Sequence, residues 1–401
     1  GIVLNRINRG VAFDDVVVLS PNLVLNIRYG ITQQEFPEYR ESRGVDLAAL
    51  GFSTQLTRLI DPARATVPRV NPDYFSDFST WEKGDGTNTS LTHNTNFSFN
   101  TQRGSHAMKW GGDFRVYRAF ENRYPLETSP GLVFSTTYTK GPLDNASAAP
   151  IGQDLASMLL GIATSGSMER PASFAMQNLY FGAFFQDDIK LTPRLTVNLG
   201  LRYEVETPLT ERFDRLVAGY AFDTPNPIDA QARANYAKSP IPQLPADQFR
   251  AMGGILFAGE TKAGRSPFRT EKNNLLPRFG LAYQLNSKTT IRSGYGIYYG
   301  TIGVNGTDPQ QFGFSQATPI QPSLDSGQSY RAFVSNPFPN GLLEPPGRSG
   351  GLRTYLSQAI TYHDLNRKQA YSQRWTLELQ RLLPSHFVID TSYVGNRGTR
   401  L

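Results

Sequence analysis

Apolar and polar residues alternate along several segments of this chain. From residue 23 to residue 32, the odd positions hold Leu, Leu, Ile, Tyr and Ile, whereas the even positions from 26 onward hold Asn, Arg, Gly and Thr. Successive side chains of a β-strand point to opposite faces of its sheet, so this period of two predicts a strand with one apolar and one polar face. The same pattern recurs in the segments 107–118, 194–206, 289–299 and 371–381.

Short turns join the predicted strands into hairpins. Each turn holds residues that tolerate turn geometry, such as Gly, Pro, Asn and Ser. The predicted turns are Ser20–Asn22, Arg103–Ser105, Thr192–Pro193, Asn286–Lys288 and Pro384–Ser385. The segments between the hairpins are long, polar and rich in Pro, Gly, Asn and Ser, and we expect loops at about 34–87, 223–273 and 301–369. A further segment, 154–161, predicts a short helix that ends at a glycine.

Repeated amphipathic hairpins fit two architectures, a soluble sandwich or propeller and a transmembrane β-barrel. The predicted strands run to about 10–14 residues, longer than most strands of soluble sheets and long enough to cross a bilayer when tilted. Their polar faces carry charges of both signs, which a wet lumen tolerates and a dry core does not. Short turns on one side and long loops on the other are typical of outer-membrane barrels. We therefore expect an all-β fold, an antiparallel transmembrane β-barrel with about 11–13 strands in this chain.

The barrel interpretation assigns each alternating side chain to the lumen or to lipid. Polar rows would face the lumen, where they could contact a plug, line a translocation path or form a solvated wall of mutual ion pairs. The lumen-facing candidates are Lys109, Asp113, Arg115, Arg202, Glu204, Arg278 and Arg292. The candidates for contact with outer-membrane lipid are Trp110, Phe114, Val197, Leu199, Leu201, Ile291, Ile297, Trp375 and Leu377.

Composition removes several classes of function. The 401 residues contain no Cys, which excludes disulfide scaffolds, Cys-ligated zinc, Fe–S clusters and thiol nucleophiles. No apolar run approaches the roughly 18 residues of a transmembrane helix, although period-two strands cross a membrane with a low average hydropathy. The net charge of +6 comes from scattered single basic residues, so we predict no nucleic-acid partner.

Residues that could carry chemistry lack the spacing that chemistry needs. The four His form no paired metal-ligand motif. Asp187 and Asp188 could hold a metal together, although hydrogen bonding at a strand end is the simpler interpretation. We therefore predict no catalytic residue, no cofactor and no resident metal.

Contacts to a solute would come from the long loops. The loop 34–87 contains an aromatic group, which could stack on a sugar or an aromatic siderophore or could pack against its own loop. The ligand-contact candidates are Tyr74, Phe75, Phe78 and Trp81.

Several hairpins resemble those of TonB-dependent outer-membrane receptors. The segment 186–204 reads QDDIKLTPRLTVNLGLRYE and the segment 103–115 reads RGSHAMKWGGDFR, and both are similar to hairpins of these receptors. NLLPRFGLAY at 274–283, with IRSGYG soon after it, is similar to a third. YVGNRGT at 393–399 resembles a motif typical of the Oar-like subgroup. The matches span roughly residues 90–401 and are specific in combination, since each hairpin alone is a weak signal.

This resemblance implies a receptor in the bacterial outer membrane that takes up a scarce solute, of the siderophore, carbohydrate or peptide class, through a plugged barrel of about 22 strands. Energy would come from the inner-membrane energy-transducing complex, which contacts such receptors through a TonB box. We expect residues 1–401 to be a portion of the barrel, with the TonB box, the plug and the C-terminal end of the receptor absent. The alternative is a structural or adhesion-type outer-membrane barrel without active transport, and a third possibility is a soluble β-rich hydrolase or lectin.

Overall fold

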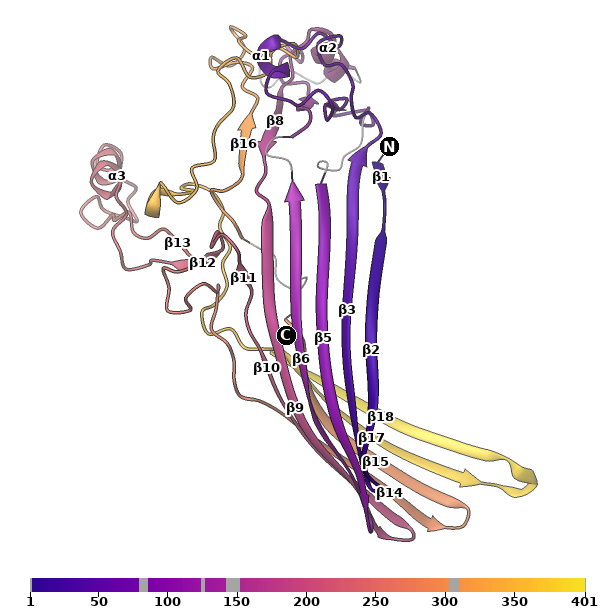
Figure 1. The fold of residues 1–401 in the computed structure, drawn as a ribbon. Coiled ribbons are helices and arrows are strands. Elements are labelled where there is room, and N and C mark those ends of the chain that lie inside the picture. The colour runs from indigo at the N-terminus through magenta and orange to yellow at the C-terminus, as the bar shows by residue number, and fades with distance from the viewer. Residues whose placement is uncertain (1, 79–85, 124–126, 142–151, 303–309, 401) are drawn as a thin grey trace.

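One continuous antiparallel sheet dominates the structure, a computed structural model that describes residues 2–78, 86–123, 127–141, 152–302 and 310–400 (Figure 1). Ten long strands follow one another across it: β2 (Ile7–Ser20), β3 (Leu23–Arg40), β5 (Gly86–Arg103), β6 (His106–Arg123), β9 (Phe174–Thr192), β10 (Leu195–Glu206), β14 (Asn274–Asn286), β15 (Thr289–Tyr299), β17 (Tyr371–Leu382) and β18 (Val388–Thr399). The short strands β1 (Ile2–Leu4), on β3, and β11 (Thr210–Glu211), on β9, bring the sheet to twelve.

The predicted all-β antiparallel fold is confirmed, as a wall that is open at both sides. Among the described strands, β2 and β18 each pair with one neighbour only. The sheet curves along its strands (Figure 1), as a barrel wall does. No helix in the described ranges is long and apolar enough to cross a membrane.

Tight turns lie at one end of the sheet and long connections at the other (Figure 1). Two-residue turns follow β2, β5, β9 and β14, and the turn between β17 and β18 contains the 3-10 helix η2 (Pro384–His386). All five predicted hairpins are therefore confirmed. In the turn after β5, Gly104 has a φ of +59°, a conformation that glycine adopts without steric cost.

The strands extend further than the apolar alternation indicates. The predicted loop 34–87 is shorter at both ends, because β3 continues to Arg40 and β5 begins at Gly86. Polar residues pair directly there, for example Gln34 with Ser90. Backbone hydrogen bonds between the strands continue where the side chains of both faces are polar. The alternation of apolar and polar residues therefore ends before the strand does.

The four long connections fold together at the loop end of the sheet, and we call their described residues the loop cap (Figure 1). The connections run between β3 and β5, β6 and β9, β10 and β14, and β15 and β17. The cap contains α1 (Thr54–Thr57), β4 (Arg69–Pro72), β7 (Gly131–Phe134), α2 (Gln153–Leu159), β8 (Ser165–Arg170), β12 (Val217–Tyr220), α3 (Asp229–Tyr236), β13 (Ile255–Phe257), β16 (Gln316–Pro319) and the 3-10 helix η1 (Gly351–Arg353). The helix α2 confirms the short helix predicted at 154–161.

Two apolar cores lie within the loop cap, and a third joins the connection between β10 and β14 to β6 and β9. In the first, Leu56, Phe134 and Phe338 come from three different connections and are almost completely buried. The strands β16, β8, β7 and β4 form a four-stranded sheet in this region. In the second core, Val217 and Phe257 of the β12–β13 pair pack against residues of the last connection. The long loops are therefore a folded layer, which the sequence pattern did not predict.

Candidate functional site

The register of the long strands produces one continuous apolar face. Trp110 of β6 pairs directly with Phe185 of β9, and Phe185 pairs with Leu201 of β10. Phe185 and Leu201 are 48% and 50% exposed, whereas monomeric soluble proteins rarely expose apolar patches beyond a few hundred Å². The predicted lipid-facing residues all lie on this face: Trp110, Phe114, Val197, Leu199, Leu201, Ile291, Ile297, Trp375 and Leu377.

The opposite face is polar and holds every predicted lumen-facing residue. Direct pairing places Asp113 opposite Gly182, Gly182 opposite Glu204, and Arg278 opposite Gly200. The full set on this face is Lys109, Asp113, Arg115, Arg202, Glu204, Arg278 and Arg292. Glycines among these rows leave room for the long basic side chains beside them.

A network of ion pairs occupies the middle of the polar face. Arg115 donates to both carboxylate oxygens of Asp113, from Nε at 3.0 Å and from Nη2 at 2.5 Å. Arg202 donates from Nε to Glu204 at 2.5 Å and from Nη2 to the Tyr180 hydroxyl at 2.7 Å. Residues two apart on a strand share a face, so the spacing of each pair in the sequence creates the contact. The charges of these four residues therefore neutralise one another within the polar face.

A separate ion pair lies nearer the turns. Arg292 of β15 donates from Nη1 to Glu378 of β17 at 2.5 Å, and the two residues are directly paired across the strands. Opposite charges in this position stabilise a strand pair by roughly 0.2–1 kcal/mol.

Within the described ranges, Lys109, Arg278 and Arg374 are cations of the polar face without a carboxylate partner, and so is Lys190 near the turn after β9. The guanidinium carbon of Arg278 lies 5.1 Å from the ring centroid of Tyr298, and that of Arg374 lies 5.6 Å from the same centroid. Stacking on an aromatic ring holds a guanidinium in place without using its N–H donors. These donors therefore stay available to a ligand.

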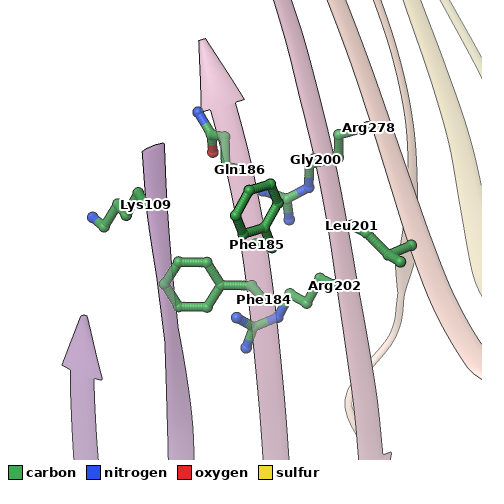
Figure 2. A pocket seen from close by; sticks show the side chains of 8 residues that line it. All are labelled: Lys109, Phe184, Phe185, Gln186, Gly200, Leu201, Arg202 and Arg278. Atoms are coloured by element: carbon green, nitrogen blue, oxygen red, sulfur yellow. The ribbon is translucent and has the colours of Figure 1, made fainter. Parts of the chain in front are cut away.

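A shallow pocket of about 240 Å³ lies among the cations near the centre of the wall (Figure 2). Lys109 reaches it from β6, Arg202 from β10 and Arg278 from β14. Gly200 opens the floor between them, because a Cβ at that position would lie 3.4 Å from the Cβ of Arg278. Gln186 also lines the pocket, together with the apolar residues Phe184, Phe185 and Leu201, so the pocket combines cationic and apolar side chains.

Buried carboxylates fasten the loop cap to the strand ends. Glu206, at the end of β10, is 2% exposed and accepts hydrogen bonds from Nδ2 of Asn178 and the backbone N–H of Ile302, both at 2.7 Å. Glu211, 1% exposed, accepts from the backbone N–H of Phe213 at 2.8 Å. Sequence reasoning missed these anchors, because Asn178 and Ile302 lie 28 and 96 residues away from Glu206 and no local pattern connects them.

Three of the four predicted aromatic contact residues are exposed at the surface of the cap. Tyr74, Phe75 and Phe78 are 55%, 38% and 61% exposed, so local packing does not use their rings fully. Trp81 lies outside the described residues. The backbone N–H of Tyr74 donates to the buried Asp154 at 2.8 Å, which fixes the start of this group.

The two adjacent aspartates serve opposite faces of the sheet. Asp187 faces the apolar side, where its Oδ2 lies 2.7 Å from Nδ1 of His106. Asp188 faces the polar side and accepts a hydrogen bond from the side-chain amide of Asn198. The two carboxylates therefore do not converge on one site, and their side-chain partners are His106 and Asn198. In the part of the chain that the structure describes, no group of three His, Asp or Glu side chains could hold a metal.

Comparison with known proteins gives one strong match and several distant ones. Residues 3–401 match the family described as outer membrane beta barrel domain. No curated protein matches the chain. Among solved structures, the outer membrane transporter YddB from Escherichia coli is 10% identical with a TM-score of 0.48, and the match covers 98% of this chain and 34% of that one. The ferric yersiniabactin uptake receptor FyuA from Yersinia pestis is 7% identical with a TM-score of 0.41, covering 98% and 36%.

The ferric-catecholate import receptor Fiu from E. coli K12 is similar at the same level, with 11% identity, a TM-score of 0.38 and coverage of 97% and 40%. The chain thus spans between 34% and 40% of the length of these three structures. Likeness this distant adds nothing to the family match. That match covers nearly the whole chain and agrees with the two-faced antiparallel sheet, so the chain belongs to the outer-membrane β-barrel domain family.

Proposed function

We propose that this chain forms part of the wall of an outer-membrane uptake receptor, with its apolar face against lipid and its polar face lining the lumen. One observation carries the proposal: direct pairing keeps the two faces separate across the long strands, from Trp110 on β6 to Trp375 on β17. Lipid would solvate the exposed apolar rows, and the ladder of backbone hydrogen bonds between neighbouring strands satisfies the backbone groups inside the sheet.

The two ends of the sheet then lie on opposite sides of the membrane. Outer-membrane barrels have short turns on the periplasmic side and long loops outside the cell. The tight turns of this chain would therefore face the periplasm, and the loop cap would face the exterior. The exposed aromatic residues Tyr74, Phe75 and Phe78, together with Trp81, would be the first groups to meet an arriving solute.

Active uptake is proposed from the hairpin motifs that resemble TonB-dependent, Oar-like receptors. The solute would be a scarce siderophore, carbohydrate or peptide. It would bind at the loop cap and pass through the lumen when the inner-membrane energy-transducing complex acts on a TonB box and plug elsewhere in the receptor. The residues of this wall would bind and guide the solute without making or breaking covalent bonds.

Energy coupling separates this function from a structural or adhesion-type barrel. Cells carrying the full-length receptor, or a deletion of it, would be offered labelled members of the three solute classes. We expect uptake that requires the receptor and stops when the proton-motive force is collapsed or the TonB box is deleted. Uptake that continues unchanged after collapse, or a deletion with normal uptake of every solute and reduced surface attachment, would favour the alternative.

A further inference from the structure

One row of directly paired residues crosses the polar face from β6 to β17. Its members are Lys109, Gln186, Gly200, Arg278, Gly296 and Arg374. Three of the six carry a positive charge, and the other three are neutral. Neighbouring strands lie about 4.8 Å apart, so Lys109 lies three strands from Arg278, and Arg278 lies two strands from Arg374.

The row also changes depth along the wall. Lys109 lies three residues from the turn end of β6, whereas Arg278 and Arg374 lie eight residues from the turn ends of β14 and β17. At about 3.4 Å per residue, Lys109 lies about 10 Å from its turn, and the two arginines lie about 27 Å from theirs. Because the turns gather at one end of the sheet (Figure 1), the cations form steps between the turn end and the loop end.

The carboxylates nearest to this row are engaged elsewhere. Asp188 accepts a hydrogen bond from Asn198, and Glu378 accepts from Arg292. The carboxylates of Asp113 and Glu204 belong to the ion-pair network with Arg115 and Arg202. The positive charge of the row is therefore not neutralised by the part of the wall that the structure describes.

Tyr298 contacts Arg278 and Arg374, the two cations of the row that lie farther from the turns. The ring of Tyr298 makes a cation–π contact with both Arg278 and Arg374. It can lie close to the wall because Gly296 is beneath it: a Cβ at Gly296 would come within 2.9 Å of the Tyr298 hydroxyl oxygen. Two guanidinium groups thus lie near one ring, and a guanidinium N–H fork suits the oxygens of a carboxylate or phosphate.

We propose that Lys109, Arg278 and Arg374 form a stepped oxyanion-binding track on the lumen wall. The track rests on the proposed function, because it requires that the polar face line a water-filled lumen. Its ligands are carboxylate or phosphate groups. They come either from a free anionic solute or from acidic side chains of a polypeptide segment of the same receptor that fills the lumen.

A single thiol in the row can report the local charge directly. The chain has no Cys, so Gln186→Cys places a unique thiol in these residues, between Lys109 and Gly200 in the pocket (Figure 2). In the full-length receptor in outer-membrane vesicles, its reaction rates with a sulfonate-bearing and a trimethylammonium-bearing methanethiosulfonate are compared, each relative to a free thiol. We expect the anionic reagent to be favoured roughly 5- to 10-fold.

Matched substitutions show whether the rate ratio depends on the cations of the track or on the overall positive charge of the polar face. Lys109→Gln with Arg278→Gln should bring the ratio of the two rates close to that of the free thiol, and Arg278→Lys should keep most of the preference. Arg292→Gln removes the same charge from a paired residue and should change the ratio little. Heat-modifiable migration on gels confirms that each variant is folded.

The two sources of the oxyanion give different signatures. A free anion predicts an accessible thiol that millimolar citrate or inorganic phosphate protects from the anionic reagent. A polypeptide carboxylate predicts a thiol that is slow with both reagents and becomes fast with both after Lys109→Gln with Arg278→Gln. If this double substitution changes neither the ratio nor the rates, there is no oxyanion track. A thiol that reacts only with lipid-soluble maleimides would instead contradict the proposed function, because the polar face would not line water.

Discussion

The long sheet and the loop cap treat large apolar side chains in opposite ways. On the sheet, Phe185 and Leu201 are about half exposed, and the polar side chains lie on the other face in mutual ion pairs. In the cap, Phe134 is 1% exposed and Met168 is completely buried. Both regions follow the same rule, that apolar surface leaves water. The difference shows that the cap supplies its own core, whereas the apolar face of the sheet has no apolar partner within the described residues, a role that the proposed function gives to lipid.

The largest effect is expected when a core side chain is removed from the cap, which tests whether the cap has its own core. Phe134→Ala should destabilise the cap locally by about 3–5 kcal/mol, because it leaves a cavity in the first apolar core. Limited proteolysis should become much faster in the long connections, while heat-modifiable migration of the barrel should be kept. Phe78→Ala, at a residue that is 61% exposed, is the control. If both variants are cleaved like the parent, the cap has no cooperative core.

A charge on the lipid side tests the sheet in the same way. Leu199→Arg should disfavour membrane insertion by about 2–4 kcal/mol if the residue lies at mid-bilayer. Asn198→Arg, one residue away on the polar face, should be far milder. The measurement is the folded fraction in lipid vesicles across a urea titration. Equal losses for the two variants would show that the faces are wrongly assigned.

The junction of the two regions should respond with a smaller effect. Glu206→Ala leaves the side-chain amide of Asn178 and the backbone N–H of Ile302 without this acceptor, which costs about 1–3 kcal/mol for buried donors. Hydrogen exchange should accelerate around residue 302, while β10 itself stays protected. Asp390→Ala, on an exposed residue of β18, serves as the control. Unchanged exchange in Glu206→Ala would mean that the cap is held by its apolar cores alone.

The smallest predicted effect lies at the surface of the cap. Hydrogen bonds from the Ser329 hydroxyl and backbone N–H, and from Ser323, lower the pKa of Asp325 to about 2. The folded pKa is below the ordinary value, so the ionised carboxylate favours this turn above about pH 4. That contribution is lost as pH falls through 2. Carboxyl carbon NMR of the parent and Asp325→Asn should assign a resonance that titrates near pH 2, and titration near 4 would contradict these hydrogen bonds.

The sheet could be predicted from the sequence and the cap could not, for a physical reason. Period-two alternation is local, so it predicted the hairpins and the two faces, with mutual ion pairs as one possible state of the polar rows. The cap depends on contacts between residues far apart in the chain, such as Leu56 with Phe338 in one core, and such contacts leave no period in the sequence.

Parts of the candidate site were also beyond local patterns. Lys109 and Arg278 were predicted as polar-face residues from their own strands. Their common row with Arg374, and the contact of Tyr298 with both arginines, depend on the register among six strands. Register across long connections is set by the whole sheet, so a single strand does not reveal which cations become neighbours.

The central claim is that β10 has lipid on one side and water on the other. Single cysteines at positions 196–201, labelled with a small fluorophore in the full-length receptor, would be tested with brominated lipid and with an aqueous iodide quencher. The account predicts quenching by brominated lipid at the sites of Val197, Leu199 and Leu201, and by iodide at the three intervening positions. Quenching without a period of two, or with the two sets exchanged, would contradict it.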